Sequence, residues 1–131
     1  MILLSNFSLT IKSMTKKRAK SKPTWNPALD AVAAASNSHK VLYEDDSVRI
    51  LDIVLLPGVK EPVHTHQWKS AMIIALPTPR IRYYDDKGKS TDYPACRKKG
   101  LSTEGIDPEG PHAVENLGNI SYCAIRVEYK I

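Results

Sequence analysis

The feature that most constrains the fold is a series of short strand-like segments separated by tight turns. Residues 48–57 (VRILDIVLLP) are rich in β-branched and aliphatic side chains and end at a Pro-Gly turn. Similar segments, each bounded by turn residues, cover residues 62–66, 70–76, 80–86, 92–98 and 110–116. Many short strands joined by tight turns predict an all-β fold, an antiparallel sandwich or barrel in a single domain.

The last segment, residues 120–131, alternates between apolar and charged side chains. The apolar face carries Cys123, Ile125, Val127 and Tyr129, and the charged face carries Arg126, Glu128 and Lys130. This period of two is typical of a strand with one buried side. We expect the apolar face to be the buried one, with Cys123 as a reduced, buried thiol.

A short helix is predicted before the strands. Asn26 can cap it, and Pro27 suits the first helical position because the N–H that proline lacks would be unpaired there anyway. Alanine-rich residues follow to about Ser36. The next histidine, His39, precedes the strands and is expected at the surface. The chain therefore divides into an arm, residues 1–25, and a barrel domain, residues 26–131.

The positive charge belongs to the arm. The chain has a formal net charge of +5, yet residues 1–25 carry six basic residues and no acidic one, so the remainder is close to neutral. Such a run predicts a solvated, flexible arm, with an organellar transit peptide as the weaker alternative. A specific nucleic-acid surface would spread basic residues over the fold. No apolar run approaches the roughly 18 residues of a membrane helix, and we expect a cytoplasmic protein that binds no membrane.

Three of the four histidines lie in suggestive settings. His64 and His66 stand two apart in PVHTHQW, and residues i and i+2 of a strand point to the same face. A divalent metal about 2.0–2.1 Å from each ring nitrogen would bridge such a pair. The spacing alone is weak evidence, because most isolated HxH pairs are incidental.

The wider pattern resembles the cupin superfamily. Gly58 is followed by five residues and then His64-Thr65-His66, and Pro108-Glu109-Gly110 is followed by His112 and Asn116. The resemblance covers roughly residues 41–129. It implies a single antiparallel cupin-type β-barrel, or jelly roll, and it implies that His64, His66 and His112 are metal ligands. Asn116 matches the pattern without being expected to ligate.

The chain departs from the family pattern in ways that bear on the metal. The position of the family's carboxylate ligand falls on Ser70, a poor ligand at neutral pH, and the closing glycine of the first motif becomes Pro77. Only Pro111 separates Gly110 from His112, whereas the family pattern has two residues between this glycine and the histidine. Three neutral imidazoles without a carboxylate favour an open coordination position for water, an anionic substrate or a gaseous ligand. The alternative is a barrel that has lost its metal.

Other side chains are candidates to replace the missing carboxylate. Glu61 precedes the histidines, and Tyr83, Tyr84 or Glu115 could reach the cavity, although a surface or packing role is the commoner outcome for each. Trp68 could pack on the barrel or line the pocket. Their positions do not follow from the sequence.

Three functions remain open at this point. The first is a metal-dependent enzyme acting on a small molecule, such as an oxygenase, in which iron, manganese, nickel or zinc acts as a Lewis acid or activates oxygen. The second is a non-catalytic barrel that binds a small ligand. The third is an interaction protein whose arm makes salt-sensitive contacts. The resemblance also implies a homodimer.

Overall fold

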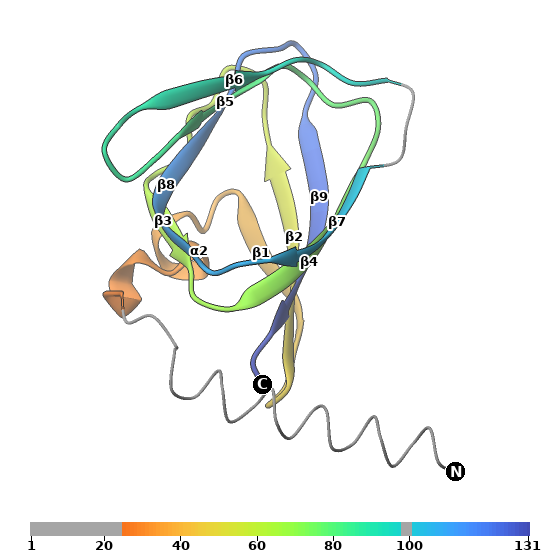
Figure 1. Cartoon of the computed structure of the whole chain (residues 1–131). Helices are drawn as coiled ribbons and strands as arrows, with labels where there is room; N and C mark the ends of the chain where they lie inside the picture. Colours follow the sequence, from red (N-terminus) through yellow and green to blue (C-terminus); the bar gives the residue numbers. More distant parts are fainter. Residues whose placement is uncertain (1–24, 98–100) are drawn as a thin grey trace.

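The computed structural model describes residues 25–97 and 101–131 as a β-barrel of two antiparallel sheets that face each other (Figure 1). Residues 1–24, which are all but the last residue of the predicted arm (1–25), lie outside the described residues. The strands are β1 (His39–Glu44), β2 (Val48–Leu55), β3 (His64–His66), β4 (Lys69–Ile74), β5 (Ile81–Tyr84), β6 (Ser90–Tyr93), β7 (Leu101–Ile106), β8 (Glu109–Asn116) and β9 (Tyr122–Tyr129). None of the described helices is long and apolar enough to cross a membrane.

The order of the strands is that of a jelly roll, because strands far apart in the chain lie side by side. The five-stranded sheet runs β1-β2-β9-β4-β7, and the four-stranded sheet runs β3-β8-β5-β6. The last strand, β9, pairs with β2 on one side and with β4 on the other. The predicted fold class is therefore confirmed. Strand β7 was missed, since LSTEGI has neither a clear alternation nor a dense run of β-branched residues.

The predicted helix forms as two short pieces. A 3-10 turn, η1 (Pro27–Leu29), is capped by Asn26 as expected, and α2 (Ala31–Ala34) follows it. Asp30 separates them because its backbone is extended, with ψ at 140°. Its side chain caps α2 by accepting a hydrogen bond from the Val32 amide at 3.2 Å. Both pieces cover the outside of the barrel beside β3.

The orientation predicted for the last strand is wrong, because its charged face points inward. Arg126 and Glu128 are buried, whereas the apolar face of β9 is half-buried or exposed and Cys123 is only partly buried. The register explains this. Leu51, which is fully buried, lies opposite Arg126, and residues opposite each other on paired strands share a face.

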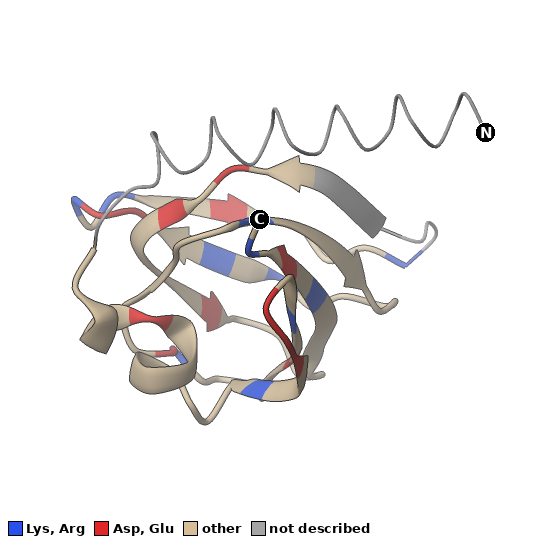
Figure 2. Ribbon diagram, turned by 90° about the horizontal axis from the view of Figure 1, so that it is seen from below, with Lys and Arg blue, Asp and Glu red and all other residues tan. Residues whose placement is uncertain are grey.

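The charged residues inside the barrel are tolerated because they pair with one another. The guanidinium of Arg49 donates to both carboxylate oxygens of Asp30 at 2.9 Å and to Glu128 at 2.6 Å. Buried charges persist only when they are paired and hydrogen-bonded in this way. Elsewhere on the ribbon, acidic and basic residues are interspersed (Figure 2). A small apolar core of Leu51, Ile53 and Ala124 lies beside the paired charges.

Candidate metal centre

The pairing of β3 with β8 brings two of the predicted site residues face to face. His64 lies opposite His112 in the ladder, and their ring centroids are 4.4 Å apart. A bulge separates His64 from His66, but both rings remain inside, 5.1 Å apart. The centroid of His66 is 5.4 Å from that of His112. The three imidazoles predicted from the sequence thus lie together, each at most 4% exposed. That they bind a metal stays a prediction.

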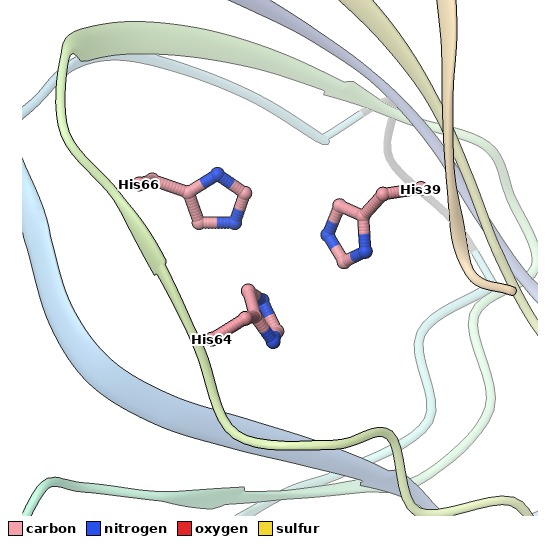
Figure 3. A group of neighbouring side chains, drawn as sticks. All are labelled: His39, His64 and His66. Carbon is pink, nitrogen blue, oxygen red and sulfur yellow. The ribbon is translucent and has the colours of Figure 1, made fainter. Parts of the chain in front are cut away.

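His39 joins this cluster, and its predicted place at the surface is wrong. Strand β1 begins at His39, which pairs with the inward-facing Ile53 and is only 3% exposed. Its ring centroid lies 4.6 Å from that of His64 and 5.3 Å from that of His66. The sequence around His39 does not alternate, so only the pairing register reveals the inward position. Figure 3 shows His39, His64 and His66 converging on a common space.

Each of the four rings is held through its Nδ1 atom. The Nδ1 atoms of His64 and His112 donate to the carbonyls of Pro62 and Gly110, at 2.9 and 2.7 Å. A carbonyl only accepts hydrogen bonds, so these two tautomers are fixed and Nε2 keeps its lone pair. Hydrogen bonds of this kind orient histidine ligands in metal sites.

The other two rings are oriented in the same way. Nδ1 of His66 lies 3.2 Å from a carboxylate oxygen of Glu128. Nδ1 of His39 lies 3.2 Å from the carbonyl of Ala35 and 3.0 Å from the hydroxyl of Ser38. All four imidazoles therefore offer Nε2 as a free electron-pair donor.

Three of the rings, those of His39, His64 and His66, are neutral, as metal ligands must be. Burial is the main cause that lowers the pKa of His39 to about 4 and that of His64 to about 3, and it also lowers the pKa of His66 well below its ordinary value. Candidate ligand atoms of these three residues all lie within 4.8 Å of one another. Neutral imidazole nitrogens suit zinc, iron and nickel. The donor set therefore fits a divalent transition metal.

A carboxyl group does reach the cluster, and it belongs to Glu61. Its side chain is buried, and its Oε1 lies 3.7 Å from Nε2 of His64. The hydroxyl of Ser38 and the amide of Val114 donate to its two oxygens at 2.9 and 3.1 Å. Burial raises the pKa of Glu61 to about 7. The sequence drew attention to Glu61 but could not place it, because the loop before β3 has no regular period.

The other candidates divide between the inside and the outside of the barrel. Tyr83 lines the cavity and stacks on His112, with 5.3 Å between ring centroids. Tyr84 and Glu115 face away, and the tyrosine hydroxyl donates to the carboxylate at 2.7 Å. Trp68 packs against Arg49 rather than lining the cavity, with the guanidinium 4.9 Å from the ring centroid.

Two further motif residues, Ser70 and Asn116, are buried outside the cavity lining. Ser70 is fully buried on β4 but does not line the cavity, so it does not take the place of the family's carboxylate. Asn116 is also fully buried. Its amide donates to the carbonyls of Leu55 and Ile120 at 3.0 and 2.8 Å, and its oxygen accepts from the Gly118 amide. Asn116 therefore holds the turn before β9.

The histidines open onto a cavity of about 150 Å³. Apolar residues form much of its wall, namely Ile53, Leu55, Met72, Ile81, Val114 and Tyr122. Arg126 and Glu109 complete it, with 2.8 Å between a guanidinium nitrogen and a carboxylate oxygen. Neither residue was identified from the sequence, since Arg126 was assigned to the outer face.

Comparison with solved structures identifies the architecture. A cupin domain from Bordetella pertussis Tohama I superposes with a TM-score of 0.59 at 18% identity, covering 71% of this chain and 92% of that one. A cupin-like protein from Thermotoga maritima MSB8 gives a TM-score of 0.50 at 18% identity, covering 71% and 68%. No protein-family model and no curated protein matches the sequence. At this identity the similarity concerns the fold alone.

Proposed function

Because the chain has the cupin fold, we propose that it is a metal-dependent enzyme that acts on a small molecule inside the barrel. The observation that carries the proposal is the convergence of four buried imidazoles on one cavity, each anchored through Nδ1. Candidate ligand atoms of His39, His64 and His66 lie within 4.8 Å of one another, and the ring centroid of His112 lies 4.4 Å from that of His64. Imidazoles anchored in this way are oriented as histidine ligands are in metal sites, with Nε2 left to bind the ion.

The metal in this proposal is held by His64, His66 and His112, with His39 in place of the family's carboxylate. His39 suits that role because its ring lies against His64 and because its Nδ1 is already engaged. When bound, a divalent ion would supply a Lewis acid or an oxygen-activating centre. Iron, nickel and zinc suit a set of imidazoles, whereas manganese prefers oxygen ligands.

The residues around the histidines have roles of their own in the proposed reaction. Glu61 is within 3.7 Å of His64 and has a pKa of about 7, so it can accept or return a proton near neutral pH. Tyr83 stacks on His112 and keeps that ring in place. The apolar wall excludes water and selects a substrate by size. A cavity equipped with a buried proton acceptor favours catalysis over simple ligand storage.

Metal uptake tests the proposal. Protein without a polyhistidine tag is dialysed against Fe²⁺, Mn²⁺, Ni²⁺ or Zn²⁺, and bound metal is measured by elemental analysis. We expect about one ion per chain in the wild type and loss of binding in His64→Ala and His112→Ala. Tyr84→Phe, on the outer face, is the matched control and should bind as the wild type does. Circular dichroism checks that each variant folds.

The enzymatic part of the proposal has a separate readout. A mixture of small metabolites is incubated with metal-loaded protein, with metal-free protein and with His64→Ala, and depletion is followed by mass spectrometry. Metal-dependent depletion of at least one compound is expected. Wild-type protein that binds metal but depletes nothing under these conditions would favour a binding barrel instead.

A further inference from the structure

The histidines are not the only polar groups in the cavity wall, because the positively charged guanidinium of Arg126 also lines it. The cavity measures about 150 Å³. In another protein an engineered cavity of this size holds benzene, so the space suits a ligand on the order of six non-hydrogen atoms. Any such ligand would contact the histidines at one end and Arg126 at another, because both line the same cavity.

Arg126 is deeply buried with few acceptors for its donors. Arg126 is only 3% exposed to solvent. One NH1 group donates to the sulfur of Met72 at 3.7 Å, and a thioether is a weak acceptor. The Nε and NH2 groups make no hydrogen bond with any described residue. Nε also lies 4.0 Å from Oε2 of Glu128, too far for a hydrogen bond. A buried guanidinium with five donors and so few hydrogen bonds is costly unless something else satisfies it.

A carboxylate already lies beside Arg126, and it belongs to Glu109, which also lines the cavity. Oε1 of Glu109 lies 2.8 Å from NH2 of Arg126, while its Oε2 lies 3.8 Å from Nε2 of His112. The pair is close but not aligned as a hydrogen bond. The Glu109 side chain is 23% exposed, so part of it is in contact with solvent. The space between Arg126 and His112 therefore accepts a carboxyl group.

We propose that the cavity binds a small carboxylic acid whose carboxylate pairs with Arg126 and displaces Glu109. The planar fork of a guanidinium matches two carboxylate oxygens, which would satisfy the donors that Glu109 leaves unaligned. The rest of the ligand packs on the apolar wall formed by Ile53, Leu55 and Met72 and reaches toward the histidines. That this acid is the substrate rests on the proposed function.

Propionate tests the proposal, with propionamide as a probe of the same shape but without charge. Binding of each to the full chain is measured by calorimetry and ligand-observed NMR, both for the Zn²⁺-loaded protein and after treatment with a chelator. The wild type should bind propionate at least about 10-fold more tightly than propionamide, because a charged hydrogen-bonded pair is worth that much or more. Arg126→Gln should abolish the difference.

Glu109→Gln should change propionate affinity in the opposite direction to Arg126→Gln. It removes the competing carboxylate at a partly exposed position, and propionate should then bind about 5-fold more tightly or better. Arg82→Gln is the matched control, because Arg82 makes an ion pair with Asp92 on the outside of the barrel. Its propionate affinity should equal that of the wild type.

The outcomes separate this inference from the proposed function. Equal binding of propionate and propionamide to the wild type would overturn the inference. So would unchanged propionate affinity in both folded Arg126→Gln and Glu109→Gln. Neither result affects metal uptake. Conversely, protein that binds no metal but discriminates the two probes through Arg126 would retain the anion site and lose the metal-dependent function.

Discussion

Nδ1 of His66 lies 3.2 Å from Oε2 of Glu128, and both side chains are at most 2% exposed. The other oxygen of Glu128 accepts from Nε of Arg49 at 2.6 Å. Glu128 therefore links the histidine cluster to the ion pair that Arg49 makes with Asp30 at the covering N-terminal segment. One carboxylate fixes the tautomer of a candidate ligand and also ties the barrel wall together.

Replacing Glu128 by Gln should weaken metal binding by about 10–100-fold, the usual effect of losing a carboxylate that orients a histidine ligand. The shape of the side chain is preserved, whereas the charge that holds His66 is lost. Affinity is measured by competition with a chelator. Glu44→Gln is the control, because Glu44 pairs with Lys130 at the surface and should leave the affinity unchanged. Equal affinities for both variants would show that Glu128 has no role at the metal.

Asp30→Ala should lower the free energy of unfolding by about 2 kcal/mol, because it removes charged hydrogen bonds to Arg49 and the cap of α2. Asp92→Ala removes a comparable two-pronged pair with Arg82 that is exposed to solvent, and its effect on the free energy of unfolding should be clearly smaller than that of Asp30→Ala. Urea denaturation measures both. Similar losses in the two variants would mean that the Asp30–Arg49 pair does not anchor the N-terminal segment.

Much of the fold could be predicted because it depends on local signals. The alternating segments and turns indicate an antiparallel barrel, and Asn26 and Pro27 indicate where the first turn begins. The inward face of β9 could not be predicted, because alternation defines two faces without saying which is buried. Here buried ion pairs reverse the usual preference, and only the register of Leu51 against Arg126 reveals it.

The candidate site could be predicted in part for a related reason. The spacing of His64 and His66 is local, and the resemblance to cupin motifs added His112. His39 and Glu61 come from segments that lack any motif, and they reach the cluster only through tertiary pairing. The loop ending at His64 and the first residue of β1 have no periodic pattern from which an inward direction could be read.

The stability of the metal-free protein should depend on pH through the buried histidines. Burial lowers the pKa values of His39 and His64 to about 4 and about 3, from an ordinary value of 6.5. Below pH 6.5 the unfolded chain takes up protons that the folded rings do not. The free energy of unfolding should therefore fall as the pH is lowered from about 6.5 toward 4. Urea denaturation at pH 7, 6 and 5 in the presence of a chelator measures this.

Glu61 acts in the opposite direction, and this provides a control. Its pKa is raised from 4.5 to about 7 in the folded state, so its contribution to stability is full below pH 4.5 and is lost as the pH rises through 7. His39→Gln should make the loss of stability on acidification shallower, and Glu61→Gln should make it steeper. Identical pH profiles for the wild type and both variants would show that these groups ionise freely in the folded protein.

The most direct test of the metal centre is an anomalous-scattering crystal structure of the protein loaded with Zn²⁺ or Fe²⁺. We predict one ion inside the barrel, with Nε2 of His64, His66, His112 and His39 about 2.0–2.1 Å from zinc. An ion bound elsewhere, or a cavity in which the four imidazoles point away from a fully loaded metal, would contradict the account.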